Sequence, residues 1–147
     1  MQQGMANSAD AEIILKLYEL RTETVMRQAR SWVIGEFWPT SADEFFEVHN
    51  DFGSQRNSWL RQVVTYWEMA ASLVLHGALS SDLFVDCNPE PFYILAKLTP
   101  ILLEIQAKLP TYFSKTLHLI EMSQSASARY EAARKSVEAR MELRAAR

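Results

Sequence analysis

Apolar residues recur at steps of three and four along most of this chain, the spacing that places side chains on one face of an α-helix. In the first long segment, residues 9–38, one face carries this repeat. It consists of Leu15, Tyr18, Thr22, Val25, Ala29 and Trp32. Pro39 ends the segment, because proline cannot continue a helix. The pattern predicts one long helix over 9–38 with Ser8 as its N-cap, although polar residues 21–24 weaken the stripe.

The segment from 54 to 76 is the most apolar helix that the pattern predicts. Ser54 has the chemistry of an N-cap, and Gly77 suits the left-handed residue that follows a helix. Apolar side chains cover almost the whole circumference between these two residues. A helix of this kind is expected at the centre of a bundle.

Shorter helices are predicted on both sides of this central one. Ser41 and Glu44 have the spacing of a capping box at the start of one, and Ser80 or Ser81 caps another. A segment over 92–109 is kinked or restarted at Pro100. No strand alternation or glycine-rich phosphate loop interrupts the helical pattern.

These elements predict an all-α fold, a compact bundle of four to six helices with a long C-terminal helix. The expected organisation is a disordered N-terminus over 1–8, a helical bundle domain over 9–125 and a charged helical arm over 126–147. The length of 147 residues supports a single domain.

The composition of the chain argues against several classes of function. The formal net charge of -3 gives no global basic field for nucleic acid, and the single cysteine, Cys87, excludes an intramolecular disulfide. Neither a secretory signal nor a run of roughly 20 apolar residues is present, so we expect a soluble, cytoplasmic protein without a transmembrane segment. We expect no cofactor and no specific nucleic-acid partner.

The C-terminal arm is a candidate contact surface. Its apolar positions form a narrow seam of Tyr130, Ala133, Val137 and Met141, which suits contact with another helix. Six basic residues stand against three acidic ones in this arm, so it also complements the acidic remainder of the chain. The seam predicts a homo-oligomer or a protein partner bound through the arm; the alternative is a solvated, frayed terminus.

The central helix carries a polar seam on one side. It consists of Arg61, Thr65, Glu68, Ser72 and His76. Glu68 and His76 could act as an acid and a base in a cleft, or the seam could be a solvent edge or a structural ion pair. Since apolar neighbours surround Glu68, we expect its carboxylate to be largely buried and paired with an arginine.

Two other groups of residues are more typical of structural roles than of a metal or ligand site. Acidic residues between 44 and 51 surround His49, but their spacing matches neither a zinc helix nor a di-iron bundle, so we interpret them as a solvated helix face and predict no metal. Trp67 and Met69 could line a ligand pocket, although their helical spacing is more typical of core.

One stretch resembles a known family. Residues 66–79, from Tyr66-Trp67-Glu68 to Gly77-Ala78-Leu79, and the acidic-apolar residues 82–84 that follow are similar to a pattern in an uncharacterised bacterial family, a domain of unknown function. The pattern is an aromatic residue, then glutamate, alanine and a helix-ending glycine, and the resemblance covers 56–103. It supports the helical fold and implies no activity.

The function predicted from the sequence is that of a non-enzymatic interaction or scaffold module acting through protein contacts. The alternative is a small-molecule binder or enzyme that uses the Glu68 and His76 seam, with Arg61 and Ser72 beside them. A concave pocket around Glu68 favours the alternative.

Overall fold

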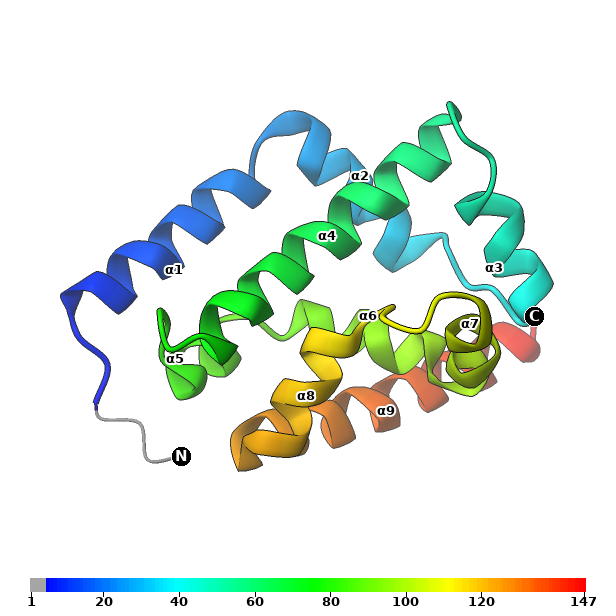
Figure 1. The fold of residues 1–147 in the computed structure, drawn as a ribbon. Helices are drawn as coiled ribbons and strands as arrows, with labels where there is room; N and C mark the ends of the chain where they lie inside the picture. Colours follow the sequence, from blue (N-terminus) through cyan, green and yellow to red (C-terminus); the bar gives the residue numbers. More distant parts are fainter. Residues whose placement is uncertain (1–4) are drawn as a thin grey trace.

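The computed structural model describes residues 5–147, and regular structure in that part of the chain is helical throughout (Figure 1). The elements are α1 (Ser8–Arg21), α2 (Thr24–Gly35), α3 (Ala42–His49), α4 (Gln55–Leu75), α5 (Ser81–Cys87), α6 (Glu90–Leu98), the 3₁₀ helix η1 (Thr99–Ile101), α7 (Leu102–Lys108), α8 (Ser114–Met122) and α9 (Gln124–Ala145). The all-α fold and the long C-terminal helix are thus confirmed. Within these residues no helix combines the length and the apolar character needed to cross a bilayer.

The chain is divided into more helices than the four to six expected. The predicted helix over 9–38 is two helices, because the carboxylate of Glu23 accepts the backbone N–H groups of Val25 and Met26 and so starts α2. This break disrupts the predicted stripe, and Leu15 and Tyr18 are exposed.

The helix starts also differ in detail from the prediction. Asn7, not Ser8, is the N-cap of α1, and Ser8, which was placed in the disordered segment, is the first residue of the helix. Residues 1–4 of that segment lie outside the described residues. At α3 Ser41 caps the helix as predicted, but Glu44 accepts the N–H of Thr40 instead of completing the box.

Helix α4 lies at the centre of the fold, as the apolar pattern predicted. It begins after the Ser54 cap and ends before Gly77, whose φ is 80°. It packs against α2, α3, α5 and α8, while α9 packs along α6 and α8 on the other side of the molecule (Figure 1). The side chain of Trp67, halfway along α4, is fully buried.

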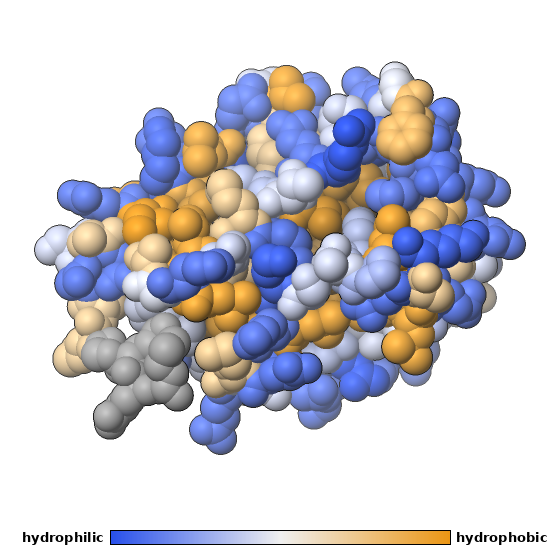
Figure 2. Space-filling model, in the orientation of Figure 1, coloured by the Kyte–Doolittle hydropathy of each residue, from blue (hydrophilic) through white to orange (hydrophobic). Residues whose placement is uncertain are grey.

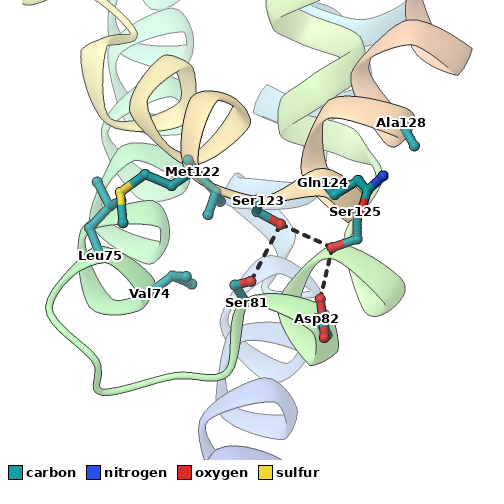
Figure 3. Close-up of a pocket in the computed structure, with 10 residues that line it drawn as sticks. Val74, Leu75, Ser81, Asp82, Met122, Ser123, Gln124, Ser125 and Ala128 are labelled. Carbon is teal, nitrogen blue, oxygen red and sulfur yellow. Dashed lines mark hydrogen bonds between the residues drawn. The ribbon is translucent and has the colours of Figure 1, made fainter. Parts of the chain in front are cut away.

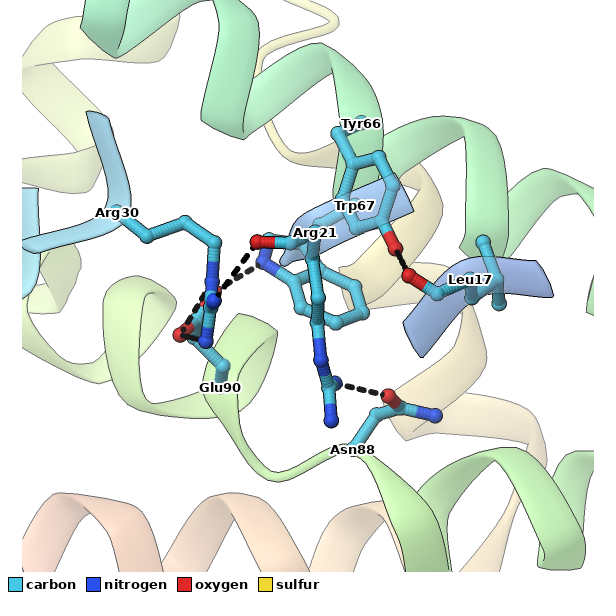
Figure 4. A network of polar contacts seen from close by, with 7 residues as sticks. All are labelled: Leu17, Arg21, Arg30, Tyr66, Trp67, Asn88 and Glu90. Atoms are coloured by element: carbon cyan, nitrogen blue, oxygen red, sulfur yellow. Dashed lines mark hydrogen bonds and ion pairs between the residues drawn. The ribbon is translucent and has the colours of Figure 1, made fainter. Parts of the chain in front are cut away.

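A charged network lies where α2, α4 and α6 meet (Figure 4). Arg30 donates to both carboxylate oxygens of Glu90, with its Nη2 2.8 Å and its Nε 2.9 Å from the nearest one. The indole N–H of Trp67 donates to the same carboxylate at 2.7 Å. One carboxylate therefore joins three helices, and the bidentate arginine compensates its burial.

Three further contacts extend this network to α1 (Figure 4). Arg21 donates to the side chain of Asn88 at 2.6 Å, and the Tyr66 hydroxyl donates to the backbone carbonyl of Leu17. Arg30 also donates to the carbonyl of Arg21, at 3.1 Å. These bonds tie the C-terminal half of α1 to α4, to α2 and to the turn between α5 and α6.

A buried lysine closes the end of α2. Lys97, on α6, is 4% exposed, and its ammonium donates to the backbone carbonyls of Val33 and Ile34, the latter at 3.2 Å. Burial, together with the positive charge of Arg144, lowers the pKa of Lys97 from 10.5 to about 7. A lysine thus satisfies helix-terminal carbonyls that no backbone donor reaches.

Replacing Glu90 by alanine should strongly destabilise the fold. The change leaves the guanidinium of Arg30 and the indole N–H of Trp67 without this acceptor, and hydrogen bonds to a charged group contribute about 1.5 to 3 kcal/mol. Urea unfolding of Glu90→Ala measures this loss. Glu138→Ala, at an exposed position on α9, is the control and should change stability by less than about 0.5 kcal/mol. Equal effects of the two variants would contradict the role of the network.

The depressed pKa of Lys97 predicts a pH dependence of stability. Between the folded pKa of about 7 and the unfolded value of 10.5, the unfolded chain binds more protons, so stability rises with pH in this window. The slope from this group is at most about 1.4 kcal/mol per pH unit. Lys97→Met removes it, so the wild-type chain should gain stability relative to the variant as pH rises from 7. Parallel stability curves would contradict the assignment.

Candidate functional site

Among the cavities of the described residues, two lie beside α4, on different parts of the surface. The first, about 510 Å³, lies between α4, α5 and the start of α9 (Figure 3). A chain of hydroxyl groups crosses it: Ser81 donates to Ser123, Ser123 bonds to Ser125, and Ser125 donates to Asp82 at 2.9 Å. Ser123 is also the N-cap of α9. These polar groups bind one another and a helix end, so they hold the helices together.

The second cavity is a groove of about 630 Å³ between α4 and residues 108–115. Its apolar lining consists of Leu60, Val64, Met69, Leu109, Pro110 and Phe113. Apolar surface is visible between polar side chains, including in the hollowed middle of the face that carries α4 and α8 (Figure 2). We refer to this cavity as the α4 groove. Its volume lies in the range of small-molecule sites, which is roughly 300 to 1,000 Å³.

Glu68 fixes the wall of the α4 groove. Its carboxylate accepts the backbone N–H groups of Lys115 and Thr116, each at 3.0 Å, and the Thr116 hydroxyl at 2.6 Å. The residue before α8, Phe113, has a left-handed backbone with φ 59° and offers no side-chain cap. A carboxylate from α4 therefore caps α8, where negative charge suits the helix dipole.

This contact corrects the expectation for Glu68. The residue has intermediate burial, and the partners of its carboxylate are backbone N–H groups at the N-terminus of α8 instead of an arginine. The first turn of α8 offers unpaired N–H groups, which compensate the carboxylate without a cation. The buried carboxylate that pairs with Arg30 is Glu90.

Arg61 is held in place at one end of the groove. Its Nη2 donates to the side-chain oxygen of Asn57 at 2.7 Å, and the Asn57 amide donates to the carbonyls of Val48 and His49 at 3.1 and 2.7 Å. Asn57 is only 2% exposed. The end of α3 thus positions Arg61 through a buried amide, which reduces the entropy that a bound ligand would have to remove.

The groove carries an excess of positive charge. Arg61, Lys108 and Lys115 line it together with a single carboxylate, that of Glu68, which is already engaged by α8. Lys108 lies over the ring of Phe46, 5.0 Å from its centroid. The whole chain has a net charge of -3, so this local excess is opposite in sign to that of the molecule.

Aromatic rings enclose the His49 end of the groove. The imidazole stacks on Phe45 at 5.5 Å and meets Tyr112 edge to face at 6.0 Å. Burial and the charge of Arg61 lower the pKa of His49, so the ring is neutral at pH 7. Burial also raises the pKa of Tyr112, and the nearby Glu68 carboxylate adds to this effect. Both rings therefore offer uncharged hydrogen-bonding groups.

The predicted polar seam is brought together only in part. Arg61, Thr65, Glu68 and Ser72 line the α4 groove, whereas His76 does not. His76 is exposed at the end of α4, where its Nδ1 bonds to the Ser72 carbonyl at 2.9 Å. Glu68 bonds to the start of α8, whereas His76 bonds within α4. The two residues therefore have different partners, which argues against an acid and base pair.

The apolar seam of the C-terminal arm faces its own domain. Val137 is 2% exposed, and the Tyr130 hydroxyl bonds to the Thr99 hydroxyl at 2.6 Å. Ala133 and Met141 are half-buried on the helix that packs along α6. Self-association through this helix stays a prediction, and with α9 in this position it would have to use the outer face of α9.

The sequence pattern did not identify several residues that line the groove. His49 was assigned to a solvated helix face, but its ring stacks among aromatic side chains. Tyr112 and Lys115 follow Pro110, and Lys108 lies in the last turn of α7; the sequence pattern pointed to none of the three. Met69 lines the groove, while its neighbour Trp67 is core as predicted.

A family model matches residues 6–123, which is most of the chain. The chain belongs to the DUF4760 family. The family is a domain of unknown function, which agrees with the resemblance seen in the sequence. Neither a curated protein nor a solved structure matches this chain. All of the α4 groove falls inside the DUF4760 match, which ends one residue before α9.

Removing the Glu68 carboxylate should destabilise this DUF4760 domain by about 1 to 2 kcal/mol, the usual cost of losing a helix cap. Glu68→Gln should lose less, because one acceptor oxygen remains. Thermal unfolding of Glu68→Ala measures the loss, with Glu121→Ala on the exposed side of α8 as the control. If the two alanine variants melt together, Glu68 does not anchor α8.

Proposed function

We propose that this domain is a non-enzymatic binding domain that takes a small amphipathic anion in the α4 groove. The observation that carries the proposal is the combination, in one groove, of an apolar lining with three cationic side chains and one engaged carboxylate. Apolar pockets with a few convergent polar groups are the usual form of small-molecule sites. A ligand with an apolar body and one anionic group satisfies both features.

The basic side chains could bind the anionic group of the ligand at either edge of the groove. Arg61 is preorganised by Asn57 and presents a planar guanidinium, which suits carboxylates and phosphates. Lys115 lies at the start of α8 and adds a second positive charge to the lining of the groove. The apolar body of the ligand would lie over Leu60, Val64 and the exposed thioether of Met69.

The roles of the titratable groups support binding over catalysis. Glu68 accepts three hydrogen bonds from α8, so its oxygens are already engaged in a structural contact. His49 is neutral and stacked between aromatic rings, where it can orient a ligand through one donor and one acceptor. Contact with a partner protein stays a further proposal, to which the groove gives no specific support.

Calorimetric titration with octanoate and with octanol tests this function. Octanoate should bind to the wild-type domain and octanol should bind more weakly, because the two probes share an apolar chain and differ in charge. Arg61→Gln and Lys115→Gln should each weaken octanoate binding by roughly tenfold, since a hydrogen bond to a charged group contributes about 1.5 kcal/mol or more.

Arg56→Gln is the matched control, because Arg56 is exposed on the same helix and does not line the groove. It should leave octanoate affinity unchanged within a factor of about two, once salt screening is held constant. Octanol binding as tightly as octanoate, or equal weakening by Arg56→Gln, would overturn the proposed function.

A further inference from the structure

Trp38, which follows α2, has two basic side chains close to its ring. The Nζ of Lys97 is 4.5 Å from the ring centroid, and the guanidinium carbon of Arg144 is 4.9 Å from it. The indole N–H donates to the carbonyl of Gly35 at 3.1 Å, which fixes the ring. Two cations thus share one aromatic ring.

A cavity of about 390 Å³ opens beside this ring. Three arginines line it, Arg140, Arg144 and Arg147, together with Trp38, Gly35 and Leu143. Arg140 and Arg144 are about one turn apart on α9, and Arg147 follows the end of that helix. Across residues 5–147 none of the three has a carboxylate within ion-pair distance, and no acidic side chain lines the cavity.

Basic residues near the C-terminus of a helix commonly compensate the helix dipole, which accounts for Arg144 in the last turn of α9. The helix dipole does not account for Arg140, which lies more than a turn from the helix end. It also does not explain why all three arginines line one cavity with Trp38. The charge of Arg144 also disfavours protonation of the buried Lys97. Arg144 and Lys97 therefore repel each other within this cluster.

We propose that the cavity formed by Trp38, Arg140, Arg144 and Arg147 binds a phosphoryl group. Several guanidinium groups converging without a carboxylate suit a multiply charged, tetrahedral anion, since arginine donates bidentately to phosphate oxygens. The bound anion offsets the repulsion between Arg144 and Lys97. This site is distinct from the α4 groove, because the two cavities share no lining residue.

Pyrophosphate is the probe, and the indole N–H resonance of Trp38 is the readout in a proton–nitrogen correlation spectrum. Trp38→Phe identifies that resonance among the four tryptophans. Pyrophosphate should shift it saturably, while chloride at equal ionic strength should not. Replacing Arg140 and Arg144 together by glutamine should weaken binding by roughly tenfold or more.

Replacing Arg56 and Arg129 together by glutamine is the matched control, because it removes the same charge away from the cavity. This variant should keep the affinity within about twofold at constant salt. If the Arg140 and Arg144 variant fails to fold, Arg147→Gln, outside any helix, carries the test.

Sedimentation with phosphatidylcholine vesicles, with and without phosphatidic acid, separates two sources of the phosphoryl group. Binding of pyrophosphate alone assigns the site to a soluble phosphate compound. Binding only to vesicles that contain phosphatidic acid, with loss in the Arg140 and Arg144 variant, assigns it to a lipid headgroup. Absence of both, or equal losses in the two double variants, overturns the proposal.

Discussion

The Glu90 carboxylate is the interaction on which the arrangement of the helices depends. A buried carboxylate has to be compensated, and this one receives Arg30 from α2 and the Trp67 indole from α4. Because the three groups come from three helices, their geometry is met only when α2, α4 and α6 take one relative position. Trp67 therefore sets the rotation of α4 about its axis.

That rotation also determines where the α4 groove forms. Glu68 is the next residue after Trp67, so fixing the indole on Glu90 directs the Glu68 carboxylate to another side of α4, where it caps α8. The segment before α8 is held against α4 by this cap and by the packing of the fully buried Phe113. The groove is thus the space left between a central helix and a loop that the same helix anchors.

Features set by neighbouring residues could be predicted from the sequence. The ends of α4 followed from Ser54 and Gly77, because N-caps and left-handed stops act within a turn of the helix. Burial of Trp67 followed from the nearly complete apolar circumference of α4. The division between α1 and α2 did not follow, since a glutamate is an unusual N-cap and Glu23 was counted as part of a polar stretch.

The partners of the charged residues could not be predicted, because they are distant in sequence. Glu68 and Thr116 are separated by 48 positions and Arg30 and Glu90 by 60, and no local pattern joins such pairs. The partner of the C-terminal seam could not be predicted either. The spacing of Tyr130 and Val137 predicts contact with a helix, but the sequence does not say whether that helix belongs to the same chain. In this structure it is α6.

The most direct test of the account is to see which cavity takes up an amphipathic anion. Met69 lines the α4 groove and Met122 lines the cavity crossed by the serine hydroxyls, so their methyl groups report on the two places separately. In a spectrum of the protein with isotope-labelled methionine methyl groups, octanoate should shift the Met69 resonance saturably and leave that of Met122 in place. A shift of Met122 with Met69 unmoved, or no shift of either, would contradict the assignment of the α4 groove as the binding site.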